Sequence, residues 1–285
     1  IAHSTDNLHH FMAHSASIFA VTFLTAAAGH GIFWTPISRA RLSEKSGYET
    51  DATTIISEPM PNVGPLGRPY PGNRPFAEPG VSVSKIGPCG MESYDALKTN
   101  WNRPDYAHGW GAVQSTYDAG SIIKVEWCVS NIADHGGLYS YRLCTDDALV
   151  AKFTDPAHTP SPEEMEAMEA CFQKGVLPCH GVQGQVCGVH PDCRGTGWGC
   201  EASNGTWFNC GPKDSGRCEA SPQAAGSCHT HGADGTILRD WVRLPTGFTS
   251  NHTLLSFRWD CEDTAQLWLH CADIAIVGAQ PPFIV

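Results

Sequence analysis

The sequence predicts a mostly β protein, and three observations lead to this fold class. Bulky or β-branched residues alternate with polar ones, the period of a half-buried strand, in four segments: 121–130, 138–144, 253–260 and 265–276. A single segment, 161–173, carries a full set of helix signals. Long stretches without either pattern separate these elements. We therefore expect an immunoglobulin- or fibronectin-like β-sandwich with long loops, a short helix and a disulfide-rich insertion.

Local residue chemistry explains the helix and the longest loop. Ser161 is a good N-cap, Pro162 suits the first helical position, and Glu163 and Glu164 suit the positive helix end, with Glu164 placed to complete a capping box. Segment 57–80 instead contains seven prolines with glycines between them. Because such a backbone sustains neither a helix nor a central strand, we expect a surface loop there.

The charge of the chain excludes some partners. It carries 18 Lys and Arg against 29 Asp and Glu, a formal net charge of −11. Nucleic acid and anionic lipid both require a basic surface, so neither is expected. An anionic polysaccharide is disfavoured for the same reason, although a local basic patch could overrule the net charge.

The N-terminal segment has the pattern of a secretory signal peptide. An apolar run from Ile18 to Ala28 is too short to span a bilayer, and the small residues Ala27 and Gly29 suit a cleavage site. We expect a leader at 1–29, with upstream read-through before Met12, and secretion of a chain that begins at His30. The alternative is that 18–29 is a buried strand or helix.

Beyond the leader we expect one domain, a cysteine-rich insertion and a tail. The domain would span 30–277, include the insertion at 171–228, and be followed by a tail or linker at 278–285. All 13 cysteines lie after His30 and eight lie in the insertion, so an exported chain would form disulfides whose pairing the sequence leaves open. Asn204 and Asn251 begin acceptor triplets for N-glycans.

An N-terminal histidine has a particular metal chemistry. Its α-amino nitrogen and its imidazole Nδ1 can close one chelate ring, and the amine loses its proton readily near neutral pH. A second imidazole would complete a nitrogen-only, tetragonal donor set that suits Cu(II). His135 is the best partner, because it lies in a turn between two predicted strands and is followed by two glycines. Taken alone, a histidine in such a turn is more often a plain surface residue.

Three stretches of the chain, in this order, resemble the lytic polysaccharide monooxygenases, also described as type-4 chitin-binding proteins. HGIFWTPISR at 30–39 resembles the start of their mature chain, ADHGG at 133–137 the turn with the second histidine, and QLWLHCADIAI at 266–276 the final strand. The resemblance covers His30 to about Val277 except for the insertion. It implies a secreted copper oxidoreductase.

The resemblance also implies roles for individual residues. His30, through its amine and side chain, and His135 would bind one copper ion as a histidine brace. Ala133 matches a small residue beside the open copper face, and Gln266 matches a residue that steers the bound oxygen species. Trp268 departs from the family, which has Tyr or Phe there to cover an axial side of the copper. An indole can cover that side but has no phenolic oxygen.

Strand alternation places Trp268 and His270 on one face of the last strand. Trp268 could instead be a core aromatic, the more frequent role of a strand tryptophan. His270 is a rival metal ligand or a pH-sensitive neighbour of the site.

The implied activity is oxidative cleavage of chitin, cellulose or pectin by a monomer. An external electron donor would reduce the copper, hydrogen peroxide or dioxygen would be the co-substrate, and hydrogen would be removed at C1 or C4 of the linkage. Aromatic rings stack on sugars, and the candidates for such a platform are Trp34, Tyr70, Trp101, Tyr106 and Trp110, each of which could equally be core.

Three alternatives remain from the sequence. A glycoside hydrolase would need paired carboxylates, and no pair stands out. A non-catalytic carbohydrate-binding or cell-wall protein could use the same fold. A zinc module could be built from residues in and after the insertion, namely Cys187, His190, Cys193, Cys228, His229 and His231.

Overall fold

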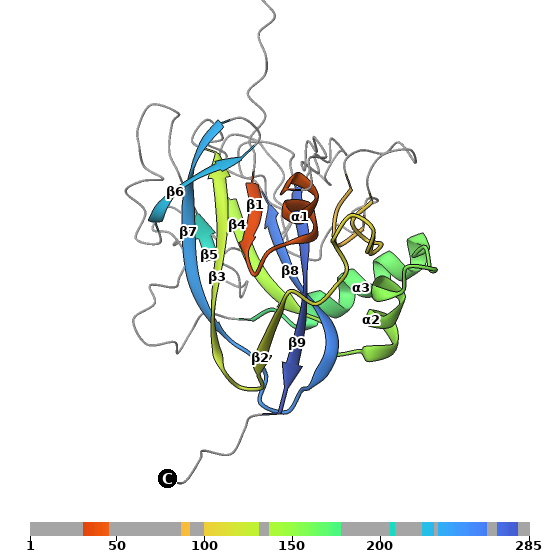
Figure 1. Cartoon of the computed structure of the whole chain (residues 1–285). Coiled ribbons are helices and arrows are strands. Elements are labelled where there is room, and N and C mark those ends of the chain that lie inside the picture. The colour runs from red at the N-terminus through yellow and green to blue at the C-terminus, as the bar shows by residue number, and fades with distance from the viewer. Residues whose placement is uncertain are drawn as a thin grey trace, which may run out of the picture.

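Two β-sheets face each other in the protein (Figure 1). The computed structural model describes residues 31–45, 87–91, 100–130, 137–177, 206–208, 224–230, 233–260 and 267–278. The four-stranded sheet has the order β1 (Gly31–Thr35), β3 (Ile122–Ser130), β7 (Ala233–Arg243), β6 (Ala224–Thr230). The five-stranded sheet has the order β2 (Ser115–Asp118), β9 (Leu267–Val277), β8 (Ser250–Asp260), β4 (Gly137–Leu143), β5 (Thr206–Phe208). The predicted β-sandwich is thereby confirmed.

The four predicted strands are present with bounds shifted by a few residues. They are β3, β4, β8 and β9, and the long antiparallel ladder between β8 and β9 pairs Trp259 with Trp268. One expectation about them is wrong, because β8 and β9 are not half-buried. Every residue of β9 up to Ile276 is buried, since one face packs on the other sheet while helices and a loop cover the opposite face.

The side chains between the two sheets form the main core. Alternate residues of β3 and β7 point inward and meet the aromatic residues of β4, β8 and β9. The fully buried members include Phe33, Trp127, Phe257, Trp259 and Trp268. Trp127 lies with its ring centroid 4.9 Å from that of Trp259. Burial of this many large rings is the dominant stabilisation of the sandwich.

Three helices are present among the described residues, where the sequence predicted one. The predicted helix is α3 (Pro162–Lys174), and Ser161 and Glu164 form the expected capping box. The helices α1 (Arg39–Lys45) and α2 (Asp147–Thr154) span seven and eight residues. Such short helices are marginal by themselves, so the sequence pattern gives little sign of them. Among the described helices, none is long and apolar enough to cross a membrane.

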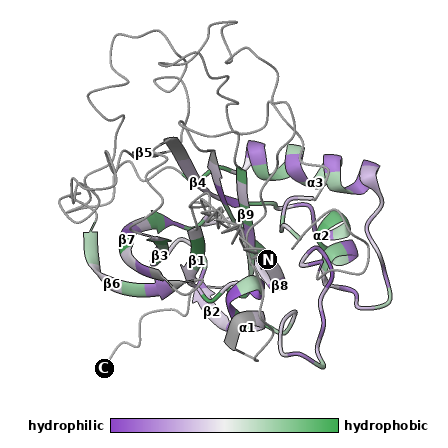
Figure 2. Cartoon of the chain, turned by 90° about the horizontal axis from the view of Figure 1, so that it is seen from above, coloured by the Kyte–Doolittle hydropathy of each residue, from purple (hydrophilic) through white to green (hydrophobic). Residues whose placement is uncertain are grey.

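The helices α2 and α3 lie on the five-stranded sheet, away from the four-stranded one (Figure 2). Their apolar side chains, among them Phe153 and Phe172, join a second core beneath the helices and the loop at 100–111. A buried ion-pair triad fastens α3 to the strands, because Glu169 Oε1 accepts from Arg142 at 2.5 Å and from Arg258 at 2.6 Å.

Disulfides join distant parts of the described chain. Cys89 is bonded to Cys271 of β9, Cys128 of β3 to Cys228 of β6, and Cys144 to Cys171 of α3. The last two bonds attach both ends of the cysteine-rich segment to the sandwich. The disulfide-stapled insertion at 171–228 stays a prediction, because most of it lies outside the described residues.

Candidate functional site

The starts of three strands meet at one end of the sandwich. The start of β1 lies beside the end of β3, with Gly31 opposite Val129. In the other sheet, Leu138 and Leu267, near the starts of β4 and β9, both pair with Asp260. A hydrogen bond from β9 to Gly31 joins the two sheets at this end.

Most of the predicted site residues lie next to these strand starts in the sequence but outside the described residues. They are His30, Ala133, His135 and Gln266, and Tyr70 is also outside. His30 directly precedes β1, His135 comes two residues before β4, and Gln266 directly precedes β9. The described strands therefore bring the chain positions next to all three to one end of the sandwich.

Gly31 is fixed by a close approach to the core. A Cβ atom at this position would lie 2.8 Å from Trp259 Cε3 and Cζ3 and 3.3 Å from Trp127 Cζ3. Real Cβ atoms essentially never approach heavy atoms within 3.0 Å. Only glycine fits at this first position of β1, because the two indole rings leave no room for a side chain. The residue that follows His30 is therefore held directly on the core.

His270 holds the main chain at the same point. Its Nε2 lies 3.0 Å from the Gly31 carbonyl oxygen, and both residues are buried. A carbonyl only accepts hydrogen bonds, so Nε2 carries the proton and donates it. In this tautomer Nε2 cannot bind a metal, and a role of His270 as a metal ligand through Nδ1 or as a pH-sensitive neighbour of the site stays a prediction. His270 is a positioning residue for the start of β1.

Trp268 lies in the core between the sheets. It is fully buried, and its ring stacks on Trp259 with centroids 5.8 Å apart and planes 24° apart. Trp259 is also the ring on which Gly31 packs. The alternative of a core aromatic therefore describes Trp268 in this structure. A further role in covering an axial side of a metal stays a prediction.

Two of the predicted platform aromatics are wrong. Trp101 and Trp110 are 0% and 4% exposed and belong to the core beneath the helices. Trp34 is partly buried, and Arg41 Cζ lies 3.4 Å from its ring centroid, so the guanidinium covers one face of the ring. Of the four candidates that the structure describes, these three are therefore buried or partly covered.

Tyr106 is the exposed member of the described candidates, at 48%. Its hydroxyl donates to the Thr154 carbonyl of α2 at 3.4 Å. Neighbouring Asp105 accepts hydrogen bonds from the backbone of Ala107 and His108, and its Oδ2 lies 2.6 Å from His108 Nδ1. Partial burial raises the pKa of Asp105, but these bonds outweigh burial, so the pKa is lowered. The loop that carries Tyr106 is thus ordered by its own carboxylate.

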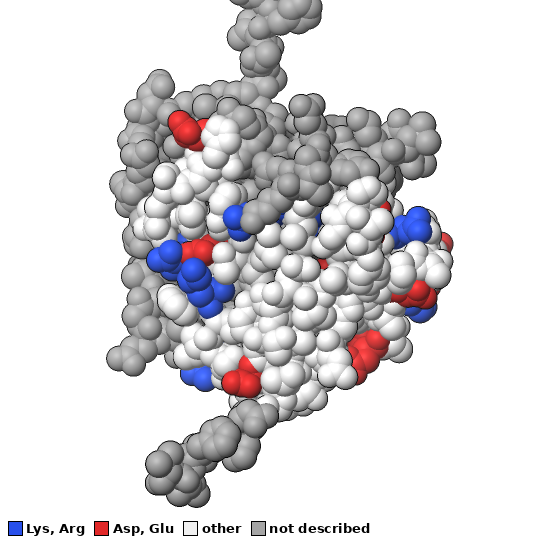
Figure 3. Space-filling model, viewed as in Figure 1, with Lys and Arg blue, Asp and Glu red and all other residues white. Residues whose placement is uncertain are grey.

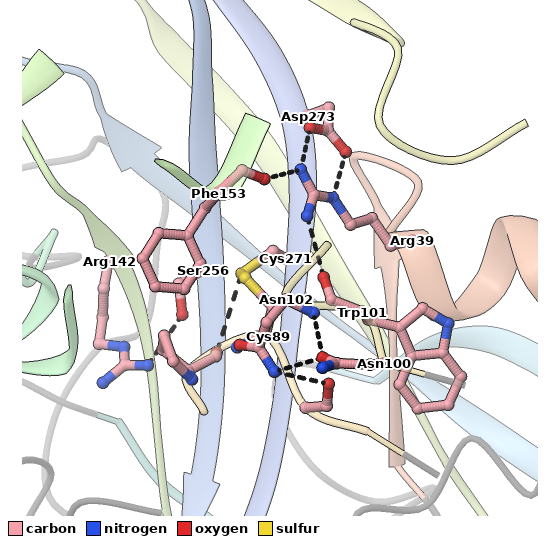
Figure 4. The surroundings of a disulfide bond; sticks show 12 residues. Arg39, Cys89, Asn100, Trp101, Asn102, Arg142, Phe153, Ser256, Cys271 and Asp273 are labelled. Carbon is pink, nitrogen blue, oxygen red and sulfur yellow. Dashed lines mark hydrogen bonds and ion pairs between the residues drawn. A yellow bond between two sulfur atoms is a disulfide. The ribbon is translucent and has the colours of Figure 1, made fainter. Parts of the chain in front are cut away.

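A buried ion pair joins the first of the three sequence motifs, at 30–39, to the last, at 266–276 (Figure 4). Arg39, the last residue of HGIFWTPISR, donates from Nε and from a terminal nitrogen to Asp273 of β9 at 2.7 and 2.6 Å. Both side chains are fully buried. Arg39 also donates to the carbonyls of Trp101 and Phe153 at 2.9 Å each. The ion pair therefore locks α1, and with it β1, onto the last strand and the covering loop.

Asp273 is the electrostatic centre of this network. His252 Nε2 lies 2.8 Å from its Oδ1. Burial pushes the pKa of Asp273 upward, but the charge and hydrogen bonds of Arg39 and the contact with His252 outweigh burial, so the pKa is lowered. Sequence reasoning missed Arg39 and Asp273. The sequence did contain a signal for this pair. Arg39 ends an apolar motif, and Asp273 is an opposite charge within the mostly apolar last strand.

The described residues contain no group of three or more His, Cys, Asp or Glu side chains arranged for a metal ion. Cys228 is bonded to Cys128, so it cannot be the zinc thiolate that the zinc alternative requires. His229 has a side chain that is 65% exposed. The other residues of that alternative, Cys187, His190, Cys193 and His231, lie outside the described part.

Comparison with known proteins gives relatives over most of the chain. The lytic polysaccharide monooxygenase aasB of Emericella nidulans is 39% identical over 270 residues, which are 92% of this chain and 75% of that protein. AA13 family lytic polysaccharide monooxygenases A of Aspergillus terreus and Pyricularia oryzae are each 36% identical and match 90% and 92% of this chain. The chain spans 60% and 64% of these two relatives. No family model matches the chain.

Solved structures give weaker similarities. A lytic polysaccharide monooxygenase AA15 from Thermobia domestica in the Cu(I) state has a TM-score of 0.42 at 17% identity and covers 88% of this chain and all of its own. A chitin-binding domain from Burkholderia pseudomallei has a TM-score of 0.45 at 16% identity, covering 87% of this chain and all of its own.

Proposed function

The chain belongs to the lytic polysaccharide monooxygenases, copper-dependent oxidoreductases that cleave polysaccharides, and from this premise we propose that His30 and His135 bind its copper ion as a histidine brace. The amine and Nδ1 of His30 and one imidazole nitrogen of His135 form a nitrogen-only donor set, which suits copper. When bound, copper supplies the one-electron and oxygen chemistry that cleaves the glycosidic linkage.

The observation that carries this proposal is the way Gly31 is held. His30 is bonded to a residue whose Cα has no room for a side chain and whose carbonyl is bound by His270. A flexible N-terminus would have to be ordered when the metal binds, at a cost in conformational entropy. Here the next residue is already fixed on the core, and this supports a preorganised ligand at position 30.

Four described residues near this end have a structural role. The His270 N–H orients the peptide that follows the proposed ligand, and Trp259 and Trp127 form the rigid surface beneath Gly31. Trp268 stacks on Trp259, and we propose that it covers one side of the metal without offering a phenolic oxygen. We propose that Gln266, which directly precedes β9, and Ala133 complete the surroundings of the metal.

We propose that the polymer is a neutral polysaccharide, because a chain with a net charge of −11 repels a polyanion at long range. Chitin and cellulose meet this condition directly, and pectin meets it where it is esterified. Among the platform candidates that the structure describes, Tyr106 on its ordered loop is the exposed ring, and we propose that it stacks on a sugar. An external reductant and either hydrogen peroxide or dioxygen would complete the reaction, with attack at C1 or C4.

Two further proposals concern the whole chain. The segment 1–29 would be removed on export, which leaves the α-amine of His30 free to bind metal. The remaining domain at 30–277, with its insertion at 171–228, would act as a secreted, glycosylated monomer. The disulfides of the described sandwich agree with an oxidising compartment.

Copper titration of protein that begins at His30 tests the proposal, and the matched control carries one extra N-terminal residue. We expect one tight site by calorimetry and a tetragonal, nitrogen-rich Cu(II) signal by electron paramagnetic resonance, both lost in the extended protein. A His135→Ala variant should lose the same signal. Tight binding that is indifferent to the extension would refute the brace.

The same preparations identify the substrate. With ascorbate and peroxide, the protein is incubated with chitin, cellulose, pectin and starch, and oxidised products are detected by mass spectrometry. We expect products from a neutral polymer only when the histidine brace is intact. Polymer binding without any copper-dependent product would leave a non-catalytic binding protein.

A further inference from the structure

The outer face of the four-stranded sheet carries an exposed tryptophan among basic residues. Inner positions of β3 and β7, such as Val125 and Val242, lie in the core between the sheets, so their neighbours in sequence point outward. The face consists of Ile122, Lys124 and Glu126 on β3 and Arg239, Trp241 and Arg243 on β7. We call this set the basic face. Figure 3 views it and shows Lys and Arg gathered over these strands.

The strand register brings these side chains together. Lys124 is directly opposite Trp241, Ile122 opposite Arg243, and Glu126 opposite Arg239. Trp241 and Ile122 are each 40% exposed, well above the level of a core side chain. The side chains of Lys124 and Arg239 are each 39% exposed. The result is a surface with one indole ring among charged side chains.

Positive charge dominates this surface. Glu126 is the one carboxylate of the basic face, and it serves two cations: Arg239 Nε at 2.6 Å and Lys124 Nζ at 3.2 Å. Burial opposes the shift, but hydrogen bonds from Thr35, Arg239 and Lys124 lower the pKa of Glu126, so it stays ionised. Arg243 donates to the Gly120 carbonyl at 3.1 Å, a neutral acceptor. The face therefore keeps a positive excess on a chain whose net charge is −11.

An indole ring beside guanidinium and ammonium groups has the chemistry to bind an acidic sugar. The ring offers an apolar face to the sugar ring, and arginine binds carboxylate with two parallel hydrogen bonds. A protein with a large negative net charge repels a polyanion at long range. A local excess of positive charge therefore determines where an acidic polysaccharide can approach its surface.

We propose that the basic face is a binding site for an acidic polysaccharide, one whose sugars carry carboxylates. It lies apart from the proposed copper end. Lys124 is five residues along β3 from Val129, the partner of Gly31, which corresponds to about 16 Å of strand. The site would hold the protein on an acidic matrix while a different surface meets the substrate, and it does not depend on the proposed brace.

Affinity electrophoresis and calorimetry with polygalacturonate test this proposal, in EDTA so that copper takes no part. The variants are Trp241→Ala and Arg243→Glu, both at exposed positions. Lys174→Glu is the matched control, because it makes the same charge change at an exposed position on α3. Tyr106→Ala is the control for the proposed substrate surface. Circular dichroism and melting temperature verify that every variant is folded.

We expect wild-type protein to be retarded by polygalacturonate and the retardation to weaken as salt is added. Trp241→Ala should weaken binding roughly tenfold or more, as loss of a central aromatic contact does. Arg243→Glu should weaken it about as much, and both controls should bind like wild type. Absence of retardation, or equal loss in Lys174→Glu, would overturn the proposal.

The same experiment tests two other ligands of the basic face, a neutral glycan and an anionic membrane. Retardation by neutral amylose that Trp241→Ala abolishes and Arg243→Glu leaves intact would show that stacking alone operates, and would overturn the acidic specificity. Co-sedimentation with phosphatidylserine vesicles, without retardation by polygalacturonate, would overturn the choice of a glycan.

Discussion

Replacing Gly31 by alanine should damage both stability and metal binding. The new Cβ would lie 2.8 Å from two carbons of Trp259 and 3.3 Å from Trp127. Neither indole can move freely, because Trp259 also stacks on Trp268 and packs against Trp127. Overpacking of this kind costs about 1–3 kcal/mol. In a domain of this size, that loss lowers the melting temperature by about 2–12 °C. Differential scanning calorimetry of the copper-free protein measures this directly.

Gly247→Ala is the matched control for this substitution. No atom lies within 4 Å of a Cβ built at Gly247, so alanine there should be neutral or slightly stabilising through the unfolded chain. Both variants share that unfolded-state effect, and their difference isolates the clash at Gly31. Copper titration of Gly31→Ala should also show weaker binding, because residue 30 would shift with its neighbour. A Gly31→Ala variant as stable as Gly247→Ala would refute the role given to this contact.

Three further predictions concern the interactions that hold the fold. Asp273→Asn should cost about 3–5 kcal/mol in urea unfolding, because it leaves the buried guanidinium of Arg39 without its counter-charge; a loss below 1 kcal/mol would contradict this. Burial raises the pKa of Glu169, but the charges and hydrogen bonds of two arginines outweigh burial and lower it. The stabilisation that Glu169 contributes is therefore complete above the ordinary pKa of about 4.3. It is lost as the pH falls through the lowered pKa. Melting temperatures should decline below about pH 4, less steeply in Glu169→Gln, and a constant melting temperature would oppose this. Removing the Cys144–Cys171 bond by a double serine substitution opens a loop of separation 27 and should cost about 3.5 kcal/mol, measured by thermal unfolding; an unchanged melting temperature would contradict it.

The strands that the sequence predicted share one property, a continuous run of apolar or alternating residues. The strand β7 has the same alternation, with Leu238 and Val242 inward and Arg239 and Trp241 outward. It was missed because its outward residues include a large aromatic and its inward residues include Asp240, which breaks the apolar pattern. In the folded protein this carboxylate accepts hydrogen bonds from the hydroxyls of Tyr139 and Tyr141 at 2.7 and 3.3 Å. Both tyrosines are distant in the sequence, so the local pattern does not indicate them.

The candidate site shows a similar limit. Local patterns indicated a possible ligand at position 30 and the strand that carries Trp268. They could not distinguish Tyr106, which is exposed, from Trp101 and Trp110, which are buried, because burial of an aromatic in a loop depends on which helices cover it. The tie between Arg39 and Asp273 spans 234 positions in the sequence, and no local pattern indicates that these two residues meet.

The two proposed surfaces differ in how they are coupled to the core. The copper end is built on inward-facing residues, so a substitution at Gly31 or His270 changes packing and ligand position together. The basic face uses outward positions of β3 and β7, where Trp241 and Arg243 are exposed. Substitution of an exposed charge such as Arg243 usually changes stability by less than about 0.5 kcal/mol. Binding of an acidic polymer can therefore be removed without disturbing the copper end, and loss of copper binding should leave polymer binding at the basic face intact.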